Sequence, residues 1–332
     1  MRIARPRPAP IALPPAAVIA AIVAIAATFA IAGTCVARRA LRGDAATIAV
    51  RQSTTMADTF GLGGLGGLSY KSDGAALPSP VEHNQIVTYY GNPYTPSMGI
   101  LGEHSPEAAA DLLAARAEQF RAIPGTRVLP ALHLVYAVAQ PQPGSDAHSL
   151  QYLDDRTVRQ FIDLARRRGF IVILDLQIGH SDALAEVERI APYLREPDVF
   201  AALDPEFALP AATKPGEKIG SIDASDINEV QAYLMWLTAS ARVPKKMLIV
   251  HQFEAGMITN ASVIEKRNDV DLVIDMDGYG PADIKEVKYQ RYGAAEYAPY
   301  GGIKVFLEHD PDPLTEQQLL SLQPRPSLIV YQ

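Results

Sequence analysis

Carboxylates and histidines follow directly after short apolar runs of this sequence. The run VFAALD ends in Asp204, and Pro205 and Glu206 come next. Four other apolar runs end in the same way, at Asp175 and Gln177, at His251 and Glu254, at Asp275 and Asp277, and at Glu308, His309 and Asp310. Two carboxyl groups in one cavity can cleave a glycosidic bond. Carboxylates with an imidazole can instead hold a divalent cation.

The apolar runs alternate with helical stretches, and this alternation predicts a (β/α)8 TIM barrel with its site at the mouth where the strands end. The expected strands are 85–90, 128–138, 170–177, 199–204, 247–252, 270–276, 303–307 and 327–331. Seven helices fit between them, so we expect an α/β barrel that lacks the last helix. We expect part of 44–82 to pack over the groove left between the eighth and first strands.

Three of the expected helices span 182–193, 225–241 and 262–267. The second carries the single tryptophan, Trp236. Its spacing with Val230, Leu234 and Leu237 predicts that it packs in the core.

The N-terminal part divides into a basic tail (1–10), an uncharged apolar stretch (11–37) and a Gly/Pro-rich linker (38–82), ahead of the barrel domain (83–332). About 20 apolar residues suffice to span a bilayer as a helix, so 11–37 is expected to be a transmembrane signal anchor. The run also ends in IAGTC, which leaves a lipoprotein signal with Cys35 as the alternative. We expect a single-pass protein of the cell membrane whose barrel is extracytoplasmic, because a single N-terminal anchor usually serves export.

The overall composition narrows the class of partner. The 332 residues carry a formal net charge of −7, which argues against nucleic acid as a partner. Cys35 is the only cysteine, so no disulfide can form within the chain. The oligomeric state stays open.

Alternation along a strand places residues two apart on the same face. Asp175 then shares a face with Gln177, Asp204 with Glu206, and Asp275 with Asp277. If these faces point inward, several carboxylates converge, and at least one carboxyl pKa should rise. His133, inside an apolar strand, is expected to be a core histidine.

This arrangement resembles that of barrel glycosidases, which place the acid/base after the fourth strand and the nucleophile after the seventh. The resemblance implies Glu206 as the general acid/base and Glu308 as the second carboxylate. It departs from that pattern at Pro205, where those enzymes usually have asparagine. The residues expected to bind substrate are Tyr89, Tyr90, Asn92, Asp175, Gln177, Asp204, His251, Gln252, Asp275, Asp277 and Tyr279. The hypothesis is a hydrolase of polysaccharide at the cell envelope.

Two alternatives remain open from the residues alone. The first is a metal-dependent hydrolase that binds Mg²⁺, Mn²⁺ or Ca²⁺ through Asp204, Glu206, His251 and Asp277. No HxH or HExxH pair supports a zinc site, and no other cofactor is expected. The second is a barrel without catalysis that binds a glycan or a partner through the same acids.

Several motifs, taken as a set, resemble a group of bacterial envelope proteins and lipoproteins of unassigned activity. They are YYGNPYTPSMGILGEHSPE, ILDLQIGHSD, ALDPEF, IGSIDASDINEV, LIVHQF and IDMDGYG. The resemblance spans nearly the whole barrel domain. It implies an exported or anchored protein and supplies no reaction.

Overall fold

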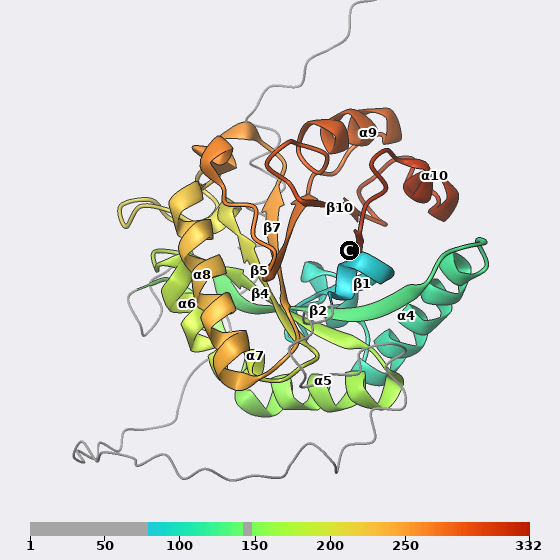
Figure 1. Ribbon diagram of the computed structural model, residues 1–332, viewed down its shortest axis with the longest axis horizontal. Coiled ribbons are helices and arrows are strands. Elements are labelled where there is room, and N and C mark those ends of the chain that lie inside the picture. The colour runs from blue at the N-terminus through green and yellow to red at the C-terminus, as the bar shows by residue number, and fades with distance from the viewer. Residues whose placement is uncertain (1–78, 142–147) are drawn as a thin grey trace, which may run out of the picture.

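The computed structural model describes residues 79–141 and 148–332, and these form a closed barrel of eight parallel strands surrounded by helices (Figure 1). Each strand pairs with the next along the chain, and β1 pairs with both β2 and β11, which closes the ring. The strands are β1 (Gln85–Gly91), β2 (Val128–Ala139), β4 (Ile171–Gln177), β5 (Val199–Asp204), β7 (Lys246–Gln252), β9 (Val270–Met276), β10 (Tyr300–Val305) and β11 (Leu328–Tyr331). The predicted barrel is confirmed.

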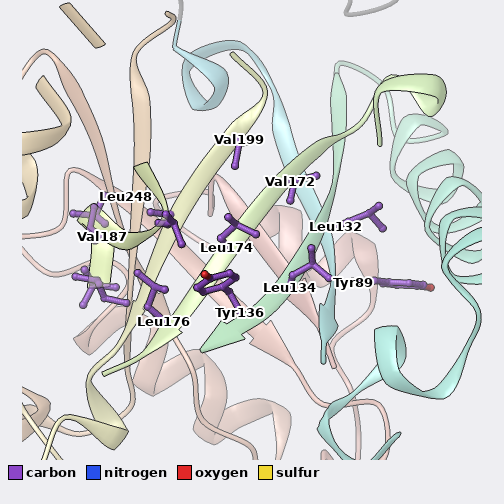
Figure 2. Packing of buried hydrophobic residues seen from close by; sticks show 14 of the residues in the cluster. Tyr89, Leu132, Leu134, Tyr136, Val172, Leu174, Leu176, Val187, Val199 and Leu248 are labelled. Atoms are coloured by element: carbon purple, nitrogen blue, oxygen red, sulfur yellow. The ribbon is translucent and has the colours of Figure 1, made fainter. Parts of the chain in front are cut away.

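The strands read as continuous apolar runs because both of their faces are buried. Val172, Leu174 and Leu176 of β4 point outward and pack in one cluster with helix residues such as Val187 (Figure 2). Ile171 and Ile173 belong to a second cluster, inside the barrel. The inward face of β4 therefore continues into Asp175 and Gln177 at the strand's end.

Helices cover the outside of the barrel, and polar caps set where they begin. Ser105, Asp154, Asp182, Asp223 and Thr315 each accept a hydrogen bond from the first turn of their helix. The outer helices are α4 (Pro106–Arg121), α5 (Asp155–Arg168), α6 (Ala183–Arg189), α7 (Ala191–Leu194), α8 (Ala224–Ala241), α9 (Ala282–Arg291) and α10 (Glu316–Ser321). The helix expected over 182–193 is two helices, because Pro192, in the first turn of α7, has no backbone N–H to continue the hydrogen bonds of α6. None of the described helices is long and apolar enough to cross a membrane.

Short elements complete the loops. They are α2 (Pro80–His83), η2 (Pro96–Met98), α3 (Ile100–Glu103), β3 (Leu150–Tyr152), η3 (Pro205–Phe207), β6 (Ile222–Asp223), η4 (Ala255–Met257), β8 (Ile258–Thr259) and η5 (Ala261–Val263). The helix predicted over 262–267 is absent, and only the η5 turn forms there. Side chains of α8 hold the remaining segment, since Asn228 and Gln231 hydrogen-bond to the backbone N–H and carbonyl of Glu265.

The prediction that Trp236 packs in the core is wrong, since its side chain is 54% exposed. The buried stripe of α8 runs through Ile227, Val230, Leu234 and Leu237. Position 236 lies on the other side of the helix, where Trp236 rests against the ring of Tyr233 at 5.6 Å between centroids.

The groove between β11 and β1 is covered by side chains of the two flanking helices. Arg116 of α4 forms an ion pair with Glu316 of α10, and its guanidinium lies 4.6 Å from the ring centroid of Tyr331. Part of 44–82 was expected to cover this groove. The structure describes only 79–82 of that range, and these residues, which begin α2, do not lie at the groove. Val81 of α2 joins the cluster inside the barrel, and Ser79 donates a hydrogen bond to Asp271 of β9. Residues 44–78 lie outside the described part of the chain.

Candidate active site

The carboxyl ends of the strands surround a cavity of about 920 Å³. Acidic and aromatic residues dominate its chemistry, and three cationic or imidazole side chains line it as well. The acidic, basic and imidazole members are Glu103, Asp204, Glu206, Glu254, Asp277, Glu308, Lys288, Lys304 and His309, and the aromatic members are Tyr90, Phe207, Phe253, Tyr279 and Phe306. The site predicted at this mouth of the barrel therefore has a cavity that could receive a ligand.

Beneath the cavity, His251 of β7 joins three carboxylates. Its Nε2 lies 2.9 Å from Asp175 Oδ2, and its Nδ1 lies 3.0 Å from Asp275 Oδ2 and 3.4 Å from Asp277 Oδ2. Burial opposes a charge on this imidazole, but Asp175 and the other carboxylates outweigh burial and raise the pKa of His251 well above its usual value. With an acceptor at each ring nitrogen, His251 is a protonated, doubly donating imidazolium.

His133 of β2 lies in the core, as expected, and completes this buried group. Its Nε2 lies 3.3 Å from Asp175 Oδ2, and its ring stacks on His251 with centroids 5.7 Å apart. Burial lowers the pKa of His133, so this ring is neutral. Burial also disfavours the charged form of Asp175, but His251 and His133 together hold its pKa well below the usual range.

Lys304 of β10 supplies the second positive charge of the site. Its Nζ donates to Asp277 Oδ2 at 3.0 Å and lies 3.7 Å from the ring centroid of Tyr90. Although burial lowers the pKa of Lys304, the charges of Asp277, Asp275 and Asp175 outweigh burial and raise it. Asp277 thus faces the cavity as half of a buried ion pair.

Asp204 and Glu206 form a contrasting pair of carboxyls at the end of β5. Pro205 starts the η3 turn, and Asp204 Oδ1 accepts the backbone N–H of Glu206 at 3.1 Å. Burial, together with the negative charges of Asp204 and Asp277, raises the pKa of Glu206 to about 8. Burial and the neighbouring carboxylates raise the pKa of Asp204 to about 7. At neutral pH Glu206 therefore carries a proton into the cavity.

Glu308 lies apart from this constellation. Strand β10 ends at Val305, two residues earlier than predicted, so Glu308 sits on an exposed turn at the rim of the cavity. The inward-facing charged residue near the end of this strand is Lys304. The strand end that was expected to supply the second carboxylate supplies a cation instead.

The polar residues predicted to bind substrate take several positions. Gln177 reaches the cavity, and its Oε1 accepts the backbone N–H of Ala139 at 2.8 Å. Gln252 is buried and does not line the cavity, because it faces the outer layer, where its Oε1 accepts the hydroxyl of Tyr297 at 2.8 Å. Asn92 is buried and donates to the carbonyl of Val135 at 2.9 Å, which makes it a brace for the loop.

The three predicted tyrosines also separate. Tyr90 is buried beneath the cavity, and burial with the charge of Asp175 raises its pKa, so its hydroxyl is neutral. Tyr279 lies at the rim, 44% exposed, with its ring edge-on to Phe306. Tyr89 points to the outer layer (Figure 2), because neighbouring residues of a strand face opposite sides. There its ring lies edge-on to that of Tyr331. The structure does not bring Tyr89 to the cavity.

His133, Lys304 and Lys288 are the site residues that sequence reasoning missed. The alternation in β10 gave a usable signal, because Lys304 shares the inward face with Phe306. A lysine at an inward position of an apolar strand requires a buried anion as its partner.

The buried group also offers donor atoms that lie close enough to hold a metal ion. The groups are His133, Asp175 and His251, and His251, Asp275 and Asp277, with donor atoms within 4.8 Å of one another. The metal ligands predicted from sequence, Asp204, Glu206, His251 and Asp277, do not form one such group, since neither Asp204 nor Glu206 belongs to either of them. Both ring nitrogens of His251 already hydrogen-bond to carboxylates, and Asp277 already forms an ion pair with Lys304. The donor set therefore fits a proton-holding ion network better than a metal centre.

No protein-family profile and no functionally curated protein matches the sequence. Among solved structures, a hyperthermophilic endo-beta-1,4-glucanase in complex with substrate is similar, with 10% sequence identity and a TM-score of 0.38. The match covers 76% of this chain and 91% of that chain. A likeness this distant carries no argument about the reaction, which has to be inferred from the residues of the cavity.

Proposed function

We propose that the protein is a glycoside hydrolase that acts on a polysaccharide, with Glu206 as its general acid. The observation that carries this proposal is the pairing of a protonated carboxyl with an ion-paired carboxylate at one cavity. Glycoside cleavage requires this division of labour, because one group protonates the leaving oxygen while the other faces the positive charge that develops on the sugar.

Glu206 suits the role of proton donor. Its pKa of about 8 keeps it protonated at neutral pH, and the cause is the burial of its carboxyl beside Asp204 and Asp277. A catalytic acid works best when its pKa lies near the working pH. After donating the proton, the same carboxylate can accept one from the attacking water.

Asp277 is our candidate for the second carboxylate, in place of Glu308. Lys304 at 3.0 Å and His251 at 3.4 Å fix its carboxylate at the cavity wall. Glu308 is exposed at the rim and has no such partners among the described ion pairs. Held between two cations, Asp277 stays in position to act as the nucleophile or as the base for a water molecule.

The remaining lining is suited to a sugar chain. Phe207, Phe253, Tyr279 and Phe306 offer ring surfaces, and Gln140 and Gln177 offer amide groups that can pair with hydroxyls. Cavities that bind organic ligands are mostly apolar with a few placed polar groups, and this cavity has that composition.

The test is to incubate the protein with a panel of polysaccharides and to measure hydrolysis as the release of reducing ends. We expect Glu206→Gln and Asp277→Asn to lower kcat by about 10²-fold or more, and Glu308→Gln to lower it far less. Hydrolysis by Glu206→Gln at the parent rate would refute the assignment. Glycan binding by the parent without turnover would show a binding protein instead.

We also propose that residues 11–37 anchor the protein in the cytoplasmic membrane with the barrel on the outer side. The support is the uncharged apolar sequence of this stretch, which lies outside the described residues. Protease added to intact cells should cut the barrel, and a barrel that survives until the cells are lysed would contradict the proposed orientation.

A further inference from the structure

Lys288 is a cation of the cavity wall that has no counter-ion in the described part of the chain. It lies on α9, is partly buried and lines the cavity. The two other lysines nearby already have counter-ions, since Lys304 pairs with Asp277 and Lys285 pairs with Asp310. No ion pair or side-chain hydrogen bond within 79–141 and 148–332 involves the ammonium of Lys288.

This ammonium lies beside the proposed reaction centre. A Cβ built on Gly278 would come within 3.4 Å of Lys288 Nζ, and Gly278 follows Asp277 directly in the chain. The same Cβ would meet Phe253 Cβ at 3.1 Å. Phe253 and Lys288 therefore pack closely over Gly278, and the missing side chain lets the Lys288 ammonium lie against the backbone next to Asp277.

The segment that carries Lys288 is held in place by a buried ion pair. Lys285 Nζ lies 2.9 Å from Asp310 Oδ2 and donates to the carbonyl of Gly278 at 2.9 Å. Asp310 also accepts the backbone N–H groups of Gly280 and Phe306. These contacts join the loop after β9 to the segment after β10. Lys288 follows Lys285 by one helical turn, so it occupies a fixed position at the wall.

The two lysines that line the cavity lie on one side of it, because Lys288 comes from α9 and Lys304 from β10, whereas Asp204 and Glu206 come from β5. Asp277 neutralises Lys304, which leaves the ammonium of Lys288 available to a ligand. A ligand with a negative group would therefore be oriented, with that group toward α9 and its scissile oxygen toward Glu206.

We propose that the sugar bound beside Asp277 carries an anionic substituent, a carboxylate or a sulfate ester, and that Lys288 binds it. This inference rests on the proposed glycoside hydrolase function and names its substrate class. A neutral sugar could offer this ammonium only hydroxyl oxygens as acceptors, whereas an anionic substituent would neutralise its charge and form a stronger, charge-assisted hydrogen bond with it.

The experiment measures binding of short glycans to the full-length protein that carries Glu206→Gln, which removes turnover. The probes are an oligogalacturonate, an oligomannuronate and an oligoglucuronate, each with its carboxyl-reduced neutral counterpart, together with sulfated forms of the neutral sugars. Each is titrated by calorimetry into the background variant and into the same variant with Lys288→Met, Lys288→Arg or Lys266→Met. Lys266 is the matched control, because it is exposed on the segment after η5.

We expect at least one anionic probe to bind about tenfold or more tightly than its neutral counterpart. Lys288→Met should abolish this preference, Lys288→Arg should keep most of it, and Lys266→Met should leave it unchanged. A preference for sulfated probes would identify the substituent as a sulfate ester, and a preference for uronates would identify a carboxylate. Equal binding of anionic and neutral probes, or a preference that survives Lys288→Met, would overturn the inference and leave the glycosidase proposal standing. No binding of any glycan would overturn both.

Discussion

Replacing Glu206 by glutamine should make the folded protein more stable at alkaline pH. The pKa of Glu206 is about 8 in the folded chain, because burial and the charges of Asp204 and Asp277 disfavour its anion, against 4.5 for an unperturbed glutamate. Between these pH values the unfolded chain releases the proton and the folded chain keeps it. The free energy of unfolding therefore falls as pH rises from 4.5 to about 8, and the loss is complete above that.

The size of the effect follows from the pKa difference. One pKa unit corresponds to about 1.4 kcal/mol, so the full rise would cost the folded state about 5 kcal/mol at most. Burial and the neighbouring carboxylates also raise the pKa of Asp204, so this second buried carboxyl still costs the folded state free energy after the substitution. We therefore expect Glu206→Gln to raise the free energy of unfolding by roughly 2–4 kcal/mol at pH 9, and by less than about 0.5 kcal/mol at pH 4.

Urea unfolding of the full chain, repeated at each pH from 4 to 9, measures the difference between the parent and Glu206→Gln. Glu254→Gln is the matched control, because Glu254 lines the same cavity but is exposed. The free energy of unfolding of Glu254→Gln should differ from that of the parent by the same amount at every pH. Parallel curves for Glu206→Gln and the parent across the whole range would refute the claim that this carboxyl is held protonated.

Two further predictions concern the same charges. The parent's kcat/KM should fall as pH rises above about 8, because Glu206 then loses the proton it must donate, and a pH–rate profile that stays level to pH 10 would exclude Glu206 as the acid. Lys304→Met should lower the free energy of unfolding by roughly 3–5 kcal/mol in urea titrations, because it leaves Asp277 beside Asp275 and Asp175 with one cation fewer. The double variant Lys304→Met/Asp277→Asn should recover part of that loss, and an unchanged stability in the single variant would contradict the buried ion pair.

The barrel could be predicted from sequence because its strands are apolar on both faces and end in polar residues. This pattern located all eight parallel strands of the ring, and the bounds of every one of them except β10 agree with the prediction to within one residue. It was less informative for the outer wall. The sequence spacing predicts a core position for Trp236, but the position lies on the opposite side of α8 from Val230, Leu234 and Leu237. No helix forms over 262–267, because side chains of α8 hydrogen-bond to the backbone of this segment.

The site was predictable in its location and only partly in its chemistry. The acids at the ends of β4, β5 and β9 do converge, and alternation explains why Asp175 and Asp277 face inward. The sequence could not show which lysines are paired in the site, because the partner of Lys304 is Asp277, which lies 27 residues away at the end of another strand. The assignment of Glu308 depended on where β10 ends, and a shift of two residues in that boundary moves the side chain from the barrel mouth to an exposed turn.

The helix α2 closes the end of the barrel that lies opposite the cavity. Val81 closes the end of the barrel where the strands begin, and Lys245, next to the start of β7, lies 3.6 Å from Glu82. Ser79 and α2 therefore lie at the end of the barrel opposite the cavity. Because α2 closes that end, it does not obstruct the cavity, and a long polymer could lie across the open mouth without meeting α2.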